Sequence, residues 1–207
     1  MGSNTYEFTD RKAKLETYEW DDLWIEQAGR KVGVRVLYVG DSISRATRRL
    51  ATAASGGNIF FDGFATSKGL DNPYFYDALR LAAKQEGERD AVLFNNGLHG
   101  WHLDDETEYR EYFVRMLDFL RAEFDGTPIA VVLTTALADL ERDSRVALRN
   151  RIAKELCDKY SIPTVDLYSL TDAHRDLFTS DGVHLNADGY KLIAEKLALE
   201  VKDLLGK

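Results

Sequence analysis

The tripeptide Gly40-Asp41-Ser42 carries a serine hydroxyl where the chain is expected to change from strand to helix. Residues 32–39, which precede it, form an apolar run rich in valine, and residues 43–54, which follow it, are helix formers. Ser42 would then lie near the positive end of a helix dipole, a place suited to a nucleophile. The alternative is ordinary turn chemistry, in which Asp41 or Ser42 only caps the helix.

A second cluster near the C-terminus contains a carboxylate and an imidazole, Asp181 and His184. An aspartate three residues before a histidine on a loop can accept a hydrogen bond from one imidazole nitrogen. The other nitrogen is then free to take a proton from a serine. The alternative is a turn at Asp181, with His184 packed before Asn186 caps the last helix. With Ser42, the pair would supply a nucleophile, a general base and the group that orients the base.

A third candidate cluster follows the apolar residues 91–94 and begins Asn95-Asn96-Gly97. Acyl transfer through a tetrahedral intermediate needs donors aimed at the developing oxyanion, and a side-chain amide at a strand end can supply one. Asn96 is the preferred candidate and Asn95 the second. The alternative is an Asn-Gly turn that only leads the chain out of the sheet.

These clusters resemble the sequence blocks of a known family, the SGNH or GDSL hydrolases. Gly40-Asp41-Ser42 is similar to the first block, and Asp181-Gly182-Val183-His184 is similar to the last, an Asp-x-x-His motif. The likeness extends from about Trp20 to the final helix. It implies a flavodoxin-like SGNH hydrolase fold, a triad of Ser42, His184 and Asp181, and catalysis without a cofactor.

The middle blocks of the family are matched less regularly. Family members usually show Gly-x-Asn-Asp where this chain has Asn95-Asn96-Gly97-Leu98-His99, which instead resembles a subset with a Phe-Asn-x-Gly-x-His signature. The resemblance also implies an oxyanion donor after the second strand. Gly63, Ser67 and Gly69 are all candidates for it, and the backbone amide of Ser42 is a further donor. Ser67-Lys68 also allows a serine–lysine interpretation, although a lysine directly after a serine usually points elsewhere.

Two histidines and a tryptophan follow the third cluster. His99 and His102, with the nearby Asp104 and Asp105, could hold a metal ion, but no third ligand stands at a helical interval. We therefore expect no metal and assign His99 to the lining of the pocket. Trp101 could stack on a sugar ring or simply cover the crevice.

The alternation of apolar runs and amphipathic segments predicts a three-layer α/β/α sandwich with a five-stranded parallel sheet. Ligands of such a sheet bind at the carboxyl ends of the strands, where Ser42 is expected. Strands are predicted at residues 32–39, 58–61, 91–94, 129–134 and 164–167. Helices are predicted at residues 43–54, 74–85, 106–124, 144–160 and 187–205. Trp20 and Trp24, four residues apart, predict that residues 1–30 form an extension whose helix packs on the domain.

Composition agrees with one catalytic domain covering residues 1–207. The chain is 44% hydrophobic and has three prolines, which suits one sizeable core without a linker. Its net charge of -8 argues against nucleic acid or an anionic membrane as the main partner. The one basic run, residues 45–49, is expected to be a solvated helix face. The single cysteine, Cys157, excludes an intrachain disulfide and suits a buried helix position.

The N-terminal residues 1–5 are polar, and no stretch reaches the ~20 apolar residues that span a bilayer. We therefore expect no signal peptide and a cytoplasmic location. The resemblance to the family implies a serine esterase that hydrolyses a small acyl ester, such as an O-acetyl group on a carbohydrate. Acyl transfer or thioester hydrolysis by the same three residues is an alternative. A second alternative is a noncatalytic module that binds a glycan or a protein in the same crevice.

Overall fold

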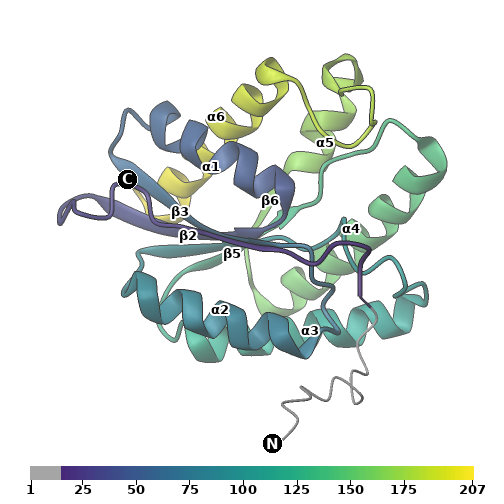
Figure 1. Ribbon diagram of the computed structural model, residues 1–207, viewed down its shortest axis with the longest axis horizontal. Helices are drawn as coiled ribbons and strands as arrows, with labels where there is room; N and C mark the ends of the chain where they lie inside the picture. The colour runs from purple at the N-terminus through teal and green to yellow at the C-terminus, as the bar shows by residue number, and fades with distance from the viewer. Residues whose placement is uncertain (1–14) are drawn as a thin grey trace, which may run out of the picture.

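The computed structural model describes residues 15–207, which form a six-stranded sheet between two layers of helices (Figure 1). The strands lie in the order β1-β3-β2-β4-β5-β6. Their bounds are β1 Asp21–Trp24, β2 Val34–Gly40, β3 Ile59–Thr66, β4 Ala91–Phe94, β5 Ile129–Leu133 and β6 Thr164–Asp166. All neighbouring pairs are parallel except β1 and β3. The predicted α/β sandwich is therefore confirmed, with one strand more than expected.

Helices cover both faces of the sheet. On one face lie α1 (Ser42–Ala54), α5 (Leu167–Asp172) and α6 (Ala187–Leu204), and on the other α2 (Pro73–Glu86), α3 (Glu106–Glu123) and α4 (Leu140–Tyr160) (Figure 1). A short 3₁₀ helix, η2, spans Arg175–Leu177. Each face has its own apolar cluster, and strand residues alternate between the two, as Leu37 and Tyr38 do. Burial on both faces explains why the parallel strands read as continuous apolar runs.

Some element bounds differ from the predictions for identifiable reasons. Strand β3 continues to Thr66, past the predicted end at residue 61, because Asp62 is fully buried and paired with Arg35 and so does not end the strand. The short helix α5 was not predicted. Its N-cap, Asp166, accepts a hydrogen bond from the backbone of Ser169, which begins a helix directly after three strand residues.

The prediction of an N-terminal helix is wrong for residues 21–24. This segment is strand β1, which runs antiparallel to β3 with Asp21 opposite Thr66. The four-residue spacing of the two tryptophans suggested a helical face, but the open edge of β3 offers backbone partners that a helix would leave unpaired. Residues 1–14 of the predicted extension lie outside the described residues.

The prediction of a solvated basic face on α1 is wrong for Arg48. Its side chain is 4% exposed, forms a salt bridge with Asp22 of β1 and lies over the Trp24 ring. Strand β1 therefore covers this face of α1 as well as the edge of β3. Cys157 is buried in α4 as predicted, and burial raises the pKa of its thiol to about 12.

Candidate active site

Ser42 and His184 meet at the carboxyl edge of the sheet, although 142 residues separate them in the chain. Ser42 is the first residue of α1, directly after β2 and the N-cap Asp41. His184 lies on the loop before α6, and its Nε2 is 2.8 Å from the Ser42 Oγ. The other ring nitrogen, Nδ1, is 2.7 Å from Asp181 Oδ2. The structure thus brings the three residues into one hydrogen-bonded chain.

The loop around His184 is held by the second oxygen of Asp181. Oδ1 accepts hydrogen bonds from the backbone N–H groups of Val183 and His184, both at 2.9 Å, and from the Thr179 hydroxyl at 2.9 Å. The bond to His184, together with these bonds, holds the pKa of Asp181 well below its usual range. Asp181 is therefore a carboxylate at neutral pH, with one oxygen fixing the loop and the other facing the imidazole. Sequence analysis assigned no role to Thr179, although a threonine two residues before an aspartate is a common local turn pattern.

This loop is also tied to the chain that follows β5. The backbone N–H of Ala138 donates to the carbonyl of Gly182 at 2.9 Å. The residue before Ala138 is Leu137, and its carbonyl accepts a hydrogen bond from the Arg175 guanidinium. Arg175 is itself paired with the buried Asp143 of α4. Tertiary contacts from α4 and η2 therefore help to fix the position of His184.

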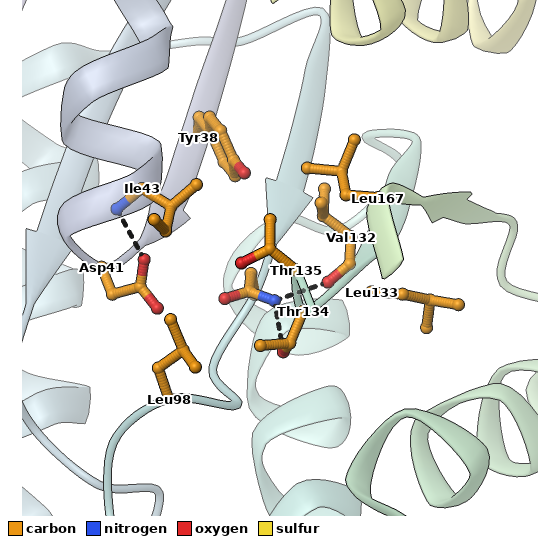
Figure 2. A pocket seen from close by; sticks show the side chains of 10 residues that line it. Tyr38, Asp41, Ile43, Leu98, Val132, Leu133, Thr134, Thr135 and Leu167 are labelled. Atoms are coloured by element: carbon orange, nitrogen blue, oxygen red, sulfur yellow. Dashed lines mark hydrogen bonds between the residues drawn. The ribbon is translucent and has the colours of Figure 1, made fainter. Parts of the chain in front are cut away.

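The nucleophile turn is held by the aspartate before the serine. The buried Asp41 accepts a hydrogen bond from the Ile43 N–H at 2.9 Å (Figure 2). This bond caps α1, so the capping role weighed for Asp41 is present, and it leaves the Ser42 hydroxyl free to face His184. The Ser42 amide lies at the start of the helix, where N–H groups have no partner within the helix.

Little space exists behind this turn. The cavity there has a volume of about 10 Å³ and is lined by residues that include Tyr38, Asp41, Leu98 and Thr135 (Figure 2). No acyl group fits in that volume. On the imidazole side the site is open, since the His184 side chain is 41% accessible.

The two asparagines after β4 have different surroundings. The Asn95 amide is bonded within the protein, since its Nδ2 donates to the Val132 carbonyl at 2.7 Å and to the Thr134 hydroxyl at 2.9 Å. The Asn96 amide donates one hydrogen bond, to the Lys68 carbonyl at 2.9 Å. Because an amide nitrogen has two protons, Asn96 keeps one for another acceptor.

The three candidates for an oxyanion donor from the second block also have different surroundings. Gly63 lies within β3 rather than at its end, under Arg48, where a Cβ would come within 2.6 Å of the arginine side chain. Ser67 accepts a hydrogen bond from the Trp20 N–H at 2.9 Å, so its hydroxyl faces the N-terminal segment. Gly69 is packed against Gly100, and a Cβ there would come within 2.9 Å of the Gly100 Cα. Of the three, only Gly69 lies in contact with the loop that follows Asn96.

Lys68 does not pair with Ser67. Its Nζ is 2.8 Å from both carboxylate oxygens of Asp21. An ammonium group held by a carboxylate is not available as a base, which argues against a serine–lysine pair.

The two histidines of the loop after β4 have separate partners. His102 Nε2 is 2.8 Å from Asp71 Oδ2, whereas His99 Nδ1 is 3.5 Å from Glu16 Oε1. Within residues 15–207 no three His, Cys, Asp or Glu side chains gather as metal ligands. Trp101 is half-buried, and three arginines of α4, Arg142, Arg145 and Arg149, lie over its ring at 4.7 to 5.5 Å. Its ring is thus occupied by cations of the same chain.

Contacts from the N-terminal segment to this loop had no signal in the sequence. Glu16 accepts a hydrogen bond from the Gly100 N–H at 3.0 Å, across 84 residues of chain. The Trp20 ring meets the His99 ring edge-on, with centroids 6.3 Å apart. The Arg45 guanidinium also lies over the Trp20 ring, 6.0 Å from its centroid. Because Arg45 is one helical turn from Ser42, this segment lies beside the candidate site.

The fold and the site define a class: an α/β sandwich with a Ser-His-Asp arrangement at the carboxyl edge of its sheet. Residues 38–192, more than half of the chain, match the GDSL-like lipase/acylhydrolase family. The chain therefore belongs to this family of esterases and acylhydrolases. Strand β1 and the segment before it lie outside the matched residues. No curated protein sequence matches the chain.

Solved structures of the same fold include several that carry esterase or transferase names. An acetyl xylan esterase has a TM-score of 0.64 and 19% identity, covering 81% of this chain and 100% of its own. The catalytic domain of a peptidoglycan O-acetyltransferase from Streptococcus pneumoniae has a TM-score of 0.63 and 15% identity, covering 85% and 97%. A carbohydrate esterase from Talaromyces cellulolyticus has a TM-score of 0.62 and 18% identity, covering 84% and 98%. At these identities the likeness shows the fold.

Within residues 15–207 no helix combines the length and the hydrophobicity that crossing a bilayer requires.

Proposed function

We propose that the protein hydrolyses small acyl esters with a catalytic triad of Ser42, His184 and Asp181. The observation that carries the proposal is the continuous chain of hydrogen bonds, 2.8 Å from Ser42 Oγ to His184 Nε2 and 2.7 Å from His184 Nδ1 to Asp181 Oδ2. A serine attacks an ester when a base accepts its proton, and the base works when a carboxylate fixes its tautomer. The family, GDSL-like lipase/acylhydrolase, supports this type of reaction.

In the proposed mechanism the Ser42 oxygen attacks the ester carbonyl while its proton passes to His184 Nε2. The tetrahedral intermediate collapses when the imidazolium returns that proton to the leaving alcohol, which breaks the ester bond and leaves an acyl group on Ser42. A water molecule then attacks the acyl-enzyme, giving its proton to His184, and the imidazolium returns that proton to the Ser42 oxygen as its bond to the acyl group breaks and the carboxylic acid leaves. Asp181 remains a carboxylate throughout and stabilises the imidazolium.

Three donors are proposed for the oxyanion. They are the backbone amide of Ser42 at the start of α1, the uncommitted proton of Asn96 Nδ2, and the backbone of Gly69 in the second block. Such donors act most strongly on the charge that develops in the transition state. No cofactor takes part in this mechanism.

The proposed substrate is a small acyl ester, such as an O-acetyl group on a carbohydrate. His184 and Asp181 are 41% and 52% exposed, so an acetyl group that projects from a large carbohydrate can reach the serine from outside. Solved structures of the same fold are named as an acetyl xylan esterase and a carbohydrate esterase. An exposed acyl-enzyme could also be attacked by an alcohol instead of water, which makes acyl transfer the second candidate, as in the named peptidoglycan O-acetyltransferase.

The test is hydrolysis of p-nitrophenyl acetate and of an acetylated xylo-oligosaccharide by the parent protein and by Ser42→Ala. We expect turnover by the parent and a loss of about 10⁴-fold or more in Ser42→Ala, with a nearly unchanged melting temperature. A Ser42→Ala rate above about a hundredth of the parent rate would place the nucleophile elsewhere. Release of acetate into water or onto an added sugar acceptor distinguishes hydrolysis from transfer.

A further inference from the structure

The loop after β4 is folded around one arginine side chain of α4. The Arg149 guanidinium donates to four backbone carbonyls, those of Gly97 (3.0 Å), His99 (2.8 Å), Gly100 (2.7 Å) and Leu103 (3.2 Å). All four acceptors lie within seven consecutive residues, and the first of them follows Asn96 directly. Arg149 thus binds more carbonyls of this segment than any other side chain described, and the neighbouring Arg145 adds bonds to the carbonyls of Trp101 and Leu103.

Among the residues that the structure describes, Arg149 is buried with no carboxylate paired to it. Its exposed fraction is 2%, and within residues 15–207 it forms no salt bridge. Burial lowers the pKa of Arg149, but a guanidinium remains charged at neutral pH. A buried charge is costly unless it is compensated, and here the carbonyl dipoles of the loop compensate it. The loop and the arginine therefore depend on each other.

Tyr109 links Arg149 to Asn96. The Tyr109 ring lies 4.6 Å from the Arg149 guanidinium, and its hydroxyl donates to the Asn96 carbonyl at 2.9 Å. The side chain of Asn96 is held as well, because its Nδ2 donates to the Lys68 carbonyl. Both ends of Asn96 are thus held, its backbone through Tyr109 and its amide through the neighbouring loop.

We propose that Arg149 is a positioning residue for catalysis, which holds the segment from Asn96 to Leu103 so that the free amide proton of Asn96 faces the oxyanion. This inference rests on the proposed function. It also requires arginine rather than lysine, because a lysine ammonium has three donors and no planar fork with which to bind four carbonyls. A misplacement of about 1 Å at a reacting centre can cost ~100-fold in rate.

The main experiment compares Arg149→Lys with the matched control Arg89→Lys. The Arg89 side chain is also 2% exposed but, unlike Arg149, it pairs with a carboxylate, Asp62 at 3.0 Å, and it lies before β4 at the opposite end of the sheet. Both variants should melt at a lower temperature than the parent. Measured below both transitions with p-nitrophenyl acetate, Arg149→Lys should lose about 10- to 100-fold in kcat with KM within about 2-fold, and Arg89→Lys should keep both constants. Equal kcat values for Arg149→Lys and the parent would overturn the inference.

A double-mutant cycle tests whether Arg149 acts through Asn96. In an Asn96→Ala background, Arg149→Lys should lower kcat by no more than about 3-fold, since the group that it positions is already gone. Independent losses that multiply would mean that Arg149 only stabilises the fold, which contradicts the inference. If Arg149→Lys does not fold, Tyr109→Phe replaces it in the cycle, because that change removes only the hydroxyl bonded to the Asn96 carbonyl.

Failure of the inference can be told from failure of the proposed function. A parent protein whose turnover depends on Ser42, combined with an unchanged kcat in Arg149→Lys, refutes the role of Arg149 alone. A parent protein with no Ser42-dependent turnover refutes the proposed function, and the inference falls with it.

Discussion

The two ends of the sheet carry charged clusters of opposite character. At the amino end, Asp62 and Arg89 pair at 3.0 Å with side chains that are 0% and 2% exposed. At the carboxyl end, Asp181 and His184 pair at 2.7 Å with side chains that are 52% and 41% exposed. Both clusters are held by hydrogen bonds, but the side chains of the first are buried and those of the second are exposed.

The comparison shows that a perturbed titratable group does not by itself identify a site. Burial raises the pKa of Glu86, in the amino-end cluster, to about 7, although Arg89 lies beside it at 3.1 Å. That value would suit a general acid or base. Its charged neighbours Arg35, Asp62 and Arg89 pair with one another, however, and none of these side chains is a nucleophile of the serine or cysteine type. We therefore interpret the amino-end cluster as structural.

The comparison is tested most strongly by breaking the amino-end cluster. Arg89→Met leaves Asp62 and Glu86 buried with one partner fewer, so the free energy of unfolding should fall by about 3–5 kcal/mol. Turnover of p-nitrophenyl acetate by the folded fraction should be unchanged. Urea unfolding and kinetics at 20 °C below the transition measure the two effects. A specific loss of kcat in folded Arg89→Met would show that the two ends are coupled.

At the carboxyl end, the two asparagines should respond differently. Asn96→Ala should lower kcat by about 10²–10³-fold with little change in KM, because the lost bond strengthens only as charge develops on the carbonyl oxygen. Asn95→Ala should instead lower the melting temperature, because the Val132 carbonyl and Thr134 hydroxyl lose a buried donor. If Asn95→Ala loses kcat with an intact fold, the two roles are exchanged.

The smallest expected effect is the pH dependence that Glu86 contributes to stability. Folding raises the pKa of Glu86 from about 4.5 to about 7, because burial favours the neutral carboxyl group. The neutral form therefore adds to the free energy of unfolding in full below pH 4.5, and this contribution is lost as the pH rises through about 7. Between pH 4.5 and 7.5 the free energy of unfolding of the parent should therefore fall by up to about 3 kcal/mol relative to that of Glu86→Gln. Melting curves of both proteins across that range measure the difference. A difference that is constant with pH would mean that Glu86 is not held in its neutral form.

Local sequence patterns predicted the parts of the fold that local physics decides. The five parallel strands are apolar runs and α1, α2, α3, α4 and α6 follow capping residues, so their existence, though not every bound, could be read from the chain. The residues of the candidate triad could be chosen because each stands at a turn beside a strand or helix. The resemblance to the family is confirmed by the match over residues 38–192, whereas the catalytic roles of the three residues stay predictions.

The features that sequence analysis missed depend on distant contacts. Strand β1 forms because the edge of β3 is open, and that edge lies about 40 residues away along the chain. Arg149 contacts carbonyls about 50 residues earlier, and in the sequence it is one of several arginines on a helix. Its burial distinguishes it, and burial follows only from the tertiary fold.

The most direct test of the account is covalent labelling of the native protein with a fluorophosphonate, which reacts with activated serine hydroxyls. We predict one equivalent of label on Ser42, located by peptide mass spectrometry, and none on the folded His184→Ala variant, whose serine has lost its base. The test needs no knowledge of the substrate. A native protein that stays unlabelled at Ser42 would contradict the proposed triad and would favour a noncatalytic module that binds a glycan or a protein in the same crevice.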